Sequence, residues 1–214
     1  MDELDQLLDR YSALIQRYHK TLDLLSDAGV RDLPRHILDA REYALLIANK
    51  AGDAPTIVDV GSGAGLPAVV IAAALPGATV HLVERRRRRT AFLELVCSTL
   101  GLSNTQVHGS DVLELDNVCA DVVTAQAVAD IPTLVRLTRH LHADPCWLVS
   151  RRGESETSDV TGVWRAAGLL ADDDASAPAD YVPAGAEFLE EPLEARGSLV
   201  AVKLPGGSAC QPSA

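Results

Sequence analysis

The sequence predicts an α/β fold: a mostly parallel, seven-stranded sheet preceded by an N-terminal helical extension. From residue 56 onwards, short β-branched runs alternate with helical segments, and such alternation gives a parallel sheet with right-handed crossovers. Before that point, apolar residues recur at helical spacing with no strand between them. We therefore expect a helical extension over 1–52, packed on an α/β domain over 53–204. The Gly/Ser/Pro-rich end, 205–214, is expected to be a disordered tail.

The extension is expected to hold two helices. Residues 2–20 carry leucines, tyrosines and an isoleucine at i, i+3, i+4, i+7 spacing, which is the pattern of an amphipathic helix. Gly29 and Pro34 interrupt the chain before a second helix over 35–49. In the α/β domain the expected elements, in order, are strand 56–60, helix 66–75, strand 79–83, helix 87–100, strands 104–108 and 121–124, helix 131–142, strand 146–150, helix 156–168, and a hairpin of strands 185–190 and 198–203.

The composition of the chain argues against several classes of protein. The chain has 214 residues, of which 47% are hydrophobic, enough for one α/β domain with a small extension. No apolar run approaches the roughly 20 residues of a membrane helix. The acidic N-terminus lacks the basic start of a signal peptide, so we expect a cytoplasmic protein without a membrane partner, and a monomer. The net charge of −11 argues against general nucleic-acid binding, although Arg85 to Arg89 and Arg151-Arg152 are locally basic.

Metal-binding patterns are absent from the sequence. The four cysteines form no C-x-x-C pair, so neither a structural zinc site nor a disulfide framework is expected. Cys97 and Cys146 lie in apolar segments and are expected to be core thiols. His140 and His142 have no third ligand placed nearby, so we expect surface histidines and no metal.

The stretch 56–67 carries the clearest chemistry. A buried strand ends in Gly61-Ser-Gly-Ala-Gly65, and a helix follows with Pro67 in its first turn. Glycines permit positive φ and close approach of a ligand, and free N–H groups at a helix start favour anionic groups. The spacing G-x-G-x-G, with Asp59 two residues earlier, differs from the G-x-G-x-x-G of dinucleotide sites and is typical of S-adenosylmethionine sites. The alternative is an ordinary tight turn without a ligand.

Other candidates follow the next strands. Glu84 ends the second strand, where an acid is placed to bind ribose hydroxyls. Asp111 follows the third strand, and either frames an adenine together with its apolar neighbours or only caps a helix. Because ligands bind at the carboxyl ends of parallel strands, we expect these groups on one rim with the segment Thr124 to Val128. The expected cofactor-binding residues are Asp59, Gly61, Ser62, Gly63, Ala64, Gly65, Glu84, Asp111, Val112, Leu113 and Gln126.

Three motifs resemble those of the glucose-inhibited division protein B family, which are bacterial guanine-N7 methyltransferases of small-subunit ribosomal RNA. They are the cofactor signature Asp59-Val-Gly-Ser-Gly-Ala-Gly-Leu-Pro67, the segment Arg35-His-Ile-Leu-Asp39, and Arg88-Arg89 followed by Phe92-Leu93. The resemblance covers Tyr11 to Leu115 and, more weakly, the chain to Lys203. It implies a Rossmann-like class I methyltransferase fold, S-adenosylmethionine as cofactor, and 16S rRNA or the 30S subunit as partner.

The sequence departs from the family pattern at four places. Asp23-Leu-Leu-Ser26 stands where the family usually has Asn-Leu-Thr, and Ala68 replaces a glycine after Leu-Pro. Arg152-Gly153 replaces Lys-Gly. The family's Ser-Arg-Ala at the end of the fourth strand is Ala125-Gln126-Ala127 here. The change at Gln126 matters most, because this position lies on the cofactor rim facing the substrate.

The reaction that the resemblance implies moves a methyl group to N7 of guanine. That nitrogen has a free lone pair and no proton, so no general base is expected, and catalysis would come from in-line placement of a splayed-out base. His36, Gln126 and Arg88 are the candidates for holding the guanine or its phosphates. The alternatives are that His36 only packs the extension on the core and that the arginine run is a solvated helix face. A small-molecule methyltransferase and a non-catalytic cofactor-binding relative remain alternatives; the glycine spacing disfavours a nicotinamide enzyme.

Overall fold

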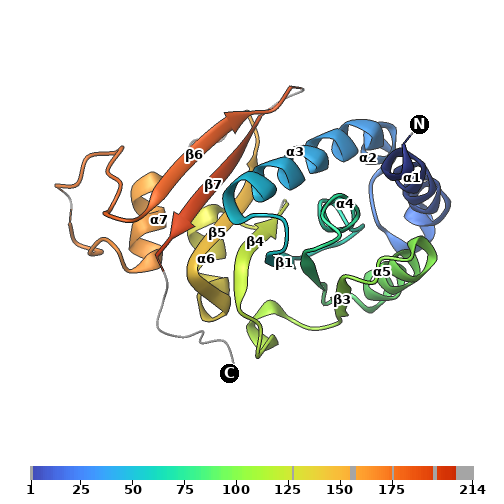
Figure 1. The fold of residues 1–214 in the computed structure, drawn as a ribbon. Helices are drawn as coiled ribbons and strands as arrows, with labels where there is room; N and C mark the ends of the chain where they lie inside the picture. Colours follow the sequence, from blue (N-terminus) through green and yellow to red (C-terminus); the bar gives the residue numbers. More distant parts are fainter. Residues whose placement is uncertain (1, 127, 155–157, 175, 195–196, 206–214) are drawn as a thin grey trace.

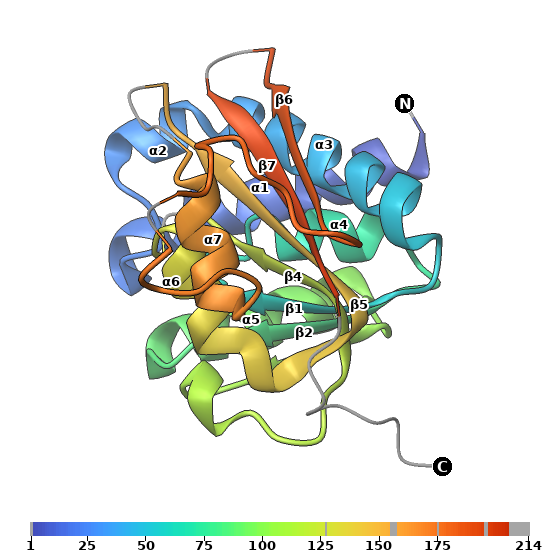
Figure 2. The same cartoon turned by 90° about the vertical axis from the view of Figure 1, so that its left-hand side faces the viewer.

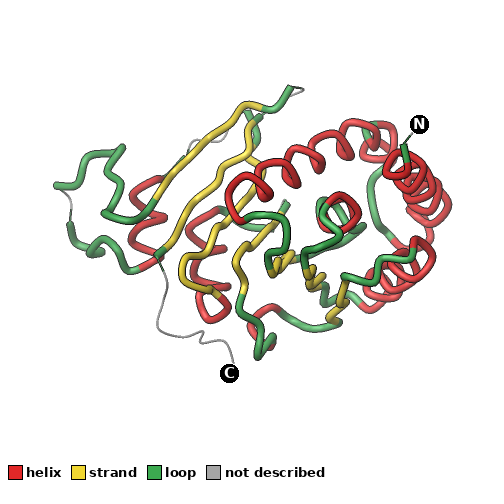
Figure 3. Tube along the Cα trace, viewed as in Figure 1, coloured by secondary structure: helices red, strands yellow, loops and turns green. Residues whose placement is uncertain are grey.

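A seven-stranded sheet with helices on both faces forms the centre of the computed structural model (Figure 1, Figure 3). The structure describes residues 2–126, 128–154, 158–174, 176–194 and 197–205. The strand order is β3-β2-β1-β4-β5-β7-β6. Apart from Pro205, the expected tail lies outside the described residues.

The seven strands confirm the expected mostly parallel sheet. Their bounds are β1 (Thr56–Val60), β2 (Thr79–Val83), β3 (Thr105–His108), β4 (Ala120–Ala125), β5 (His142–Arg152), β6 (Glu187–Pro192) and β7 (Ser198–Leu204). Strands β1 to β5 pair in parallel, whereas β7 runs antiparallel to both β5 and β6. The expected terminal hairpin is therefore present and forms one edge of the sheet. The carboxyl ends of β1, β2, β3, β4 and β5 meet at a single rim.

Helices cover the two faces unequally. Their bounds are α1 (Glu3–Leu22), α2 (Asp27–Arg31), α3 (Leu33–Ala51), α4 (Ala68–Ala74), α5 (Arg87–Leu100), α6 (Ile131–Thr138) and α7 (Val160–Ala167), with short 3-10 turns η1 (Val112–Glu114) and η2 (Arg139–Leu141). One hydrophobic cluster joins the sheet to α1, α3, α4 and α5, and a second joins it to α6 and α7 (Figure 2). No helix among the described residues has the length and apolar character to cross a bilayer.

The N-terminal helices share the core of the sheet. Helix α1 begins after Asp2, whose side chain accepts a hydrogen bond from the N–H of Asp5, and it buries Tyr11 and Ile15. Helix α3 buries Tyr43 among its inward-facing residues. These side chains belong to the same hydrophobic cluster as Ile57 of β1, so the helical extension and the sheet bury one continuous apolar surface.

The element boundaries differ from expectation by a few residues in several places, of which four bear on the site or the sheet. Helix α2 was not expected; Ser26 begins it by accepting a hydrogen bond from the N–H of Gly29. Helix α4 starts at Ala68, because the glycine turn continues through Pro67. The expected helix over 131–142 ends at Thr138, and β5 starts as early as His142, because the chain is already paired with β4 there. Helix α7 starts at Val160, and residues 155–157 of its expected range lie outside the described residues.

Candidate functional site

The glycine turn forms a tight loop at the carboxyl end of β1. The backbone N–H groups of Gly61 and Ser62 both donate to the carbonyl of Val83 on β2, at 2.8 and 3.1 Å. Gly61, Gly63 and Gly65 have φ values of +68, +55 and +95°, which other residues adopt only at a cost. The expected strand-turn-helix unit is therefore present, and the conformation explains why glycines occupy alternate positions.

Helix α1 packs directly against this loop. The hydroxyl of Tyr11 donates to the carbonyl of Ala64 at 2.8 Å, and the Tyr11 side chain is fully buried. A Cβ atom on Gly65 would lie 2.6 Å from Cγ2 of Val69 and 3.0 Å from the Tyr11 oxygen. Gly65 is therefore required by packing behind the loop rather than by a ligand in front of it.

Glu84 lies beside the loop at the end of β2, as expected. Its side chain is 5% exposed, and its two oxygens accept hydrogen bonds from the N–H groups of Gly63 at 3.1 Å and Arg86 at 2.8 Å. These bonds fix the carboxylate orientation. Because each carboxylate oxygen accepts more than one hydrogen bond, Glu84 retains capacity for a ligand's hydroxyl groups.

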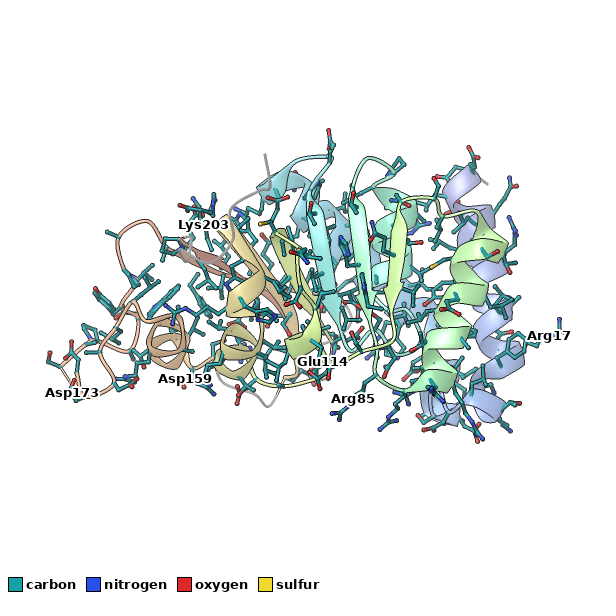
Figure 4. The ribbon with its side chains drawn as sticks, turned by 90° about the horizontal axis from the view of Figure 1, so that it is seen from below. Arg17, Arg85, Glu114, Asp159, Asp173 and Lys203 are labelled. Carbon is teal, nitrogen blue, oxygen red and sulfur yellow. The ribbon has the colours of Figure 1, made fainter. Side chains whose placement is uncertain are left out.

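The loop and Glu84 open onto a cleft of about 860 Å³, which lies within the usual range of ligand sites. Figure 4 shows Arg85 and Glu114 at this edge of the sheet, with Asp159 and Asp173 on one flank and Arg17 on the other. Most of the expected cofactor residues line the cleft: Gly61, Ser62, Gly63, Ala64, Glu84, Asp111, Val112, Leu113 and Gln126. Asp59 and Gly65 lie behind the loop and are not among the lining residues.

Asp59 is a buried carboxylate with an incomplete set of partners. Its Oδ1 accepts a hydrogen bond from the hydroxyl of Thr124 at 2.7 Å, and its Oδ2 has no partner among the described residues. Burial raises the pKa of Asp59 to about 7. Asp59 does not line the cleft, so it supports the loop from behind. The groups that do line the cleft, the glycine backbone and the Glu84 carboxylate, fit the amino-acid and ribose parts of S-adenosylmethionine.

Asp111 performs the capping role and also lines the cleft. Its carboxylate accepts a hydrogen bond from the N–H of Leu113 at 3.1 Å, which begins η1, and lies 3.8 Å from a guanidinium nitrogen of Arg85. Val112 is buried, whereas Leu113 is exposed beside the cleft. The two interpretations that the sequence left open are thus compatible, because one segment places a carboxylate and two apolar side chains at the rim.

A second part of the cleft, which we call the α3 side, consists of Leu24, Leu25, His36 and Gln126. His36 comes from α3, and its Nδ1 is buried without a hydrogen-bond partner among the described residues. Burial lowers the pKa of His36, so the neutral imidazole is favoured at neutral pH. His36 lines the cleft and also belongs to a helix that packs on the core, so packing alone does not account for its position.

The α3 side rests on an ion pair that sequence reasoning missed. Asp39, which is 4% exposed, accepts a hydrogen bond from Nε of Arg151 at 3.2 Å. The hydroxyl of Tyr43 donates to the carbonyl of Ala125 at 3.3 Å, directly before Gln126. Two such contacts tie α3 to the ends of β5 and β4. The only sequence signal was that Asp39 lies one helical turn after His36, on a face that is otherwise apolar.

The arginine run divides between the cleft and solvent. Arg85, Arg86 and Arg89 line the cleft, whereas Arg88 is exposed on α5 and is not a lining residue. Nε of Arg89 donates to the carbonyl of Asp23 at 3.0 Å, and the Asp23 carboxylate lies 3.7 Å from Arg86 and 3.4 Å from Arg89. The N-terminal extension is therefore tied to the arginines at the mouth of the cleft.

Cysteine and histidine contacts test the remaining expectations. Cys97 and Cys146 are free and buried, as expected, whereas Cys119 is disulfide-bonded. His142 is buried and lies 2.9 Å from the hydroxyl of Thr138, which corrects the expectation of a surface histidine. Within the described part of the chain, no group of three or more His, Cys, Asp or Glu side chains is arranged to hold a metal ion.

Comparison with other sequences matches residues 4–170 to the family described as rRNA small subunit methyltransferase G, or GidB. A ribosomal RNA small subunit methyltransferase G from Bradyrhizobium sp. (strain BTAi1) is 36% identical over 173 residues, which cover 76% of each chain. The protein of the same name from Ralstonia nicotianae is 34% identical over 74% of this chain and 73% of its own. That from Acidothermus cellulolyticus is 44% identical over 140 residues, 60% of this chain and 59% of its own.

Solved structures agree on the fold. A putative O-methyltransferase from Klebsiella pneumoniae covers 97% of this chain and 91% of its own with a TM-score of 0.57 at 13% identity. A variant of MtNAS solved with S-adenosylmethionine covers 95% of this chain and 78% of its own with a TM-score of 0.55 at 18% identity. These likenesses show a class I methyltransferase fold. The sequence matches go further, and by them this chain belongs to the rRNA small subunit methyltransferase G (GidB) family.

Proposed function

We propose that this S-adenosylmethionine-dependent methyltransferase transfers a methyl group to N7 of a guanine in small-subunit (16S) ribosomal RNA. One observation carries the proposal: a single cleft joins the glycine loop and Glu84 to side chains of the N-terminal extension, with Arg85, Arg86 and Arg89 at its mouth. The proposed cofactor site is continuous with a pocket that is partly apolar and contains the neutral imidazole of His36. Such a pocket suits a flipped-out base, and the arginines beside it suit the phosphates that flank the base.

The proposed cofactor contacts follow from the geometry of the loop. The backbone of Gly61 to Ala64 and the carboxylate of Glu84 would hold the amino-acid and ribose parts, and Asp111, Val112 and Leu113 would frame the adenine. Gln126 lies where the cofactor and the acceptor would meet. Asp59 and Gly65 support the loop from behind. When bound, the cofactor supplies an activated methyl group on a sulfonium.

The protein's part in the reaction is placement. Because N7 of guanine has a lone pair and no proton, the site needs no general base and no metal ion, and the rate gain comes from in-line alignment. His36 and Gln126 would orient the base from the α3 side. Of the arginines, Arg85, Arg86 and Arg89 are better placed for phosphates than Arg88, which is directed to solvent.

The proposal also covers the organisation of the chain. We propose that residues 1–52 act as an acceptor-binding extension of the methyltransferase domain 53–204, because Leu24, Leu25 and His36 of the extension line the cleft. We also propose that the protein acts as a monomer. We propose that it acts in the cytoplasm, because ribosomal subunits are assembled there.

The test is to incubate the protein with tritiated S-adenosylmethionine and 30S subunits from cells that lack the family enzyme, and then to map the labelled base. Label at N7 of a single 16S rRNA guanine is the expected result. Label on a small acceptor instead of RNA would identify a small-molecule methyltransferase. Cofactor binding in calorimetry without label on any acceptor would identify a non-catalytic relative. Either of the last two results contradicts the proposal.

A further inference from the structure

A charge pair that the proposed reaction does not use lies behind the α3 side of the cleft. Asp39 and Arg151 are 112 positions apart, and their side chains are 6% and 19% exposed. Taking two charges out of water is costly, and an ion pair so placed is frequently no more stable than an apolar substitute. The pair therefore calls for an explanation besides stability.

Strand register places Arg151 beside the cleft. Ala125 of β4 pairs with Ser150 of β5, so the next residues, Gln126 and Arg151, are neighbours at the carboxyl edge of the sheet. Both point to the face of the sheet that α3 covers, because side chains alternate along a strand and Val149 belongs to the cluster on that face. Arg151 thus lies next to a cleft-lining residue, on the side from which His36 enters.

We propose that Arg151, held by Asp39, is a positioning residue for the acceptor base: the pair ties α3 to the end of β5 and so fixes His36 and Gln126 relative to each other. The inference rests on the proposed function, since it assigns that function's acceptor to the α3 side. It also accounts for the departure at Gln126. The family motif has an arginine at position 126, and here an arginine stands at the neighbouring position of the adjacent strand, where the two backbones lie about 4.8 Å apart at the usual strand spacing.

The charges around His36 provide a readout that distinguishes the loss of either charge from a general loosening of α3. Asp39 and Asp32 raise the pKa of His36, whereas Arg35 and Arg151 lower it. Substituting Arg151 and substituting Asp39 should therefore shift the pKa of His36 in opposite directions. Arg151→Met should raise the pKa of His36, and Asp39→Asn should lower it, whereas a general loosening of α3 would move both variants in the same direction, toward the ordinary value.

The first measurement is titration of the His36 ring by NMR in the wild type, Arg151→Met and Asp39→Asn. The control is Arg165→Met, which removes another partly buried arginine from α7, on the opposite face of the sheet. Opposite shifts in the two pair variants and none in the control are expected. Shifts of the same sign would overturn the proposal. This measurement needs no substrate, so it judges the pair even if the rRNA assignment fails.

The second measurement is methyl transfer to 30S subunits, with cofactor affinity measured separately by calorimetry. Arg151→Met should raise KM for the subunits about tenfold, since α3-side contacts are lost, and change the cofactor Kd less than twofold. Exchanging the two residues, Arg151→Gln with Gln126→Arg, should recover most of the lost kcat/KM. An exchange variant no more active than Arg151→Met, or a parallel loss of cofactor affinity, would overturn the proposal. If Arg151→Met does not fold, the exchange variant and Asp39→Asn carry the test.

Discussion

Two buried carboxylates lie behind the cleft, and their surroundings differ. Asp59, beneath the glycine loop, has a hydroxyl donor on one oxygen and no partner on the other among the described residues. Asp39, beneath the α3 side, is bound by the guanidinium of Arg151. The buried charge behind the α3 side is therefore balanced within the protein, whereas the carboxyl group beneath the loop has no cationic partner among the described residues.

The largest expected difference is in stability. Asp39→Asn removes the buried carboxylate that accepts a hydrogen bond from Nε of Arg151, and should lower the free energy of unfolding by about 3 kcal/mol. Asp59→Asn removes a carboxylate that has no cation, so at neutral pH it should cost less than about 1 kcal/mol. Urea unfolding of both variants at the same pH measures the contrast. Equal losses in the free energy of unfolding would contradict the proposed difference between the two carboxylates.

The second largest expected loss of stability comes from crowding behind the glycine loop. Gly65→Ala forces a Cβ atom to within 2.6 Å of Val69 and 3.0 Å of Tyr11 at a φ of +95°, so it should destabilise the protein by about 2–3 kcal/mol. Gly101→Ala is the matched control, because φ there is +72° but nothing lies within 4 Å, and it should cost only about 1 kcal/mol. Thermal or urea unfolding distinguishes them; similar losses would mean that backbone strain alone matters.

The pKa of Asp59 predicts a pH dependence of stability. Its folded pKa of about 7 exceeds the ordinary value of 3.8, so the folded state binds the proton more tightly. The stabilisation is complete below pH 3.8 and is lost as the pH rises through 7. From about pH 5 to about pH 8 the wild type should lose about 2 kcal/mol relative to Asp59→Asn. Parallel pH profiles for the two proteins would show that Asp59 is ionised throughout.

The smallest effect concerns the exposed acid at the mouth of the cleft. Asp23→Asn removes a charge that lies within 4 Å of Arg86 and Arg89, and asparagine tolerates the positive φ of this position. Affinity for 30S subunits should rise about threefold, with a steeper salt dependence. The control is Asp9→Asn, an exposed acid on α1, which should change little. Unchanged affinity in Asp23→Asn would mean that these arginines do not meet phosphate.

Local signals in the sequence account for much of the fold. The β-branched run before Gly61 and the glycine spacing predict the strand, the turn and the ligand class, because each depends on neighbouring residues. The seven strands and the acid at Glu84 follow in the same way. Errors fall at element ends, such as His142, where pairing with β4 extends a strand into a segment with a helical pattern.

The tertiary structure decided which polar side chains meet partners that are distant in the sequence. The hydroxyl of Tyr11 reaches the carbonyl of Ala64 across 53 positions, and Arg151 reaches Asp39 across 112. Periodicity indicates which face of a helix is buried, but it does not say which buried polar groups meet. The sequence by itself thus determined the fold class and the conformation of the glycine loop. The assembled sheet and helices decided that Asp59 stays partly unsatisfied while Asp39 gains a cation, since only packing sets which charges share a buried space.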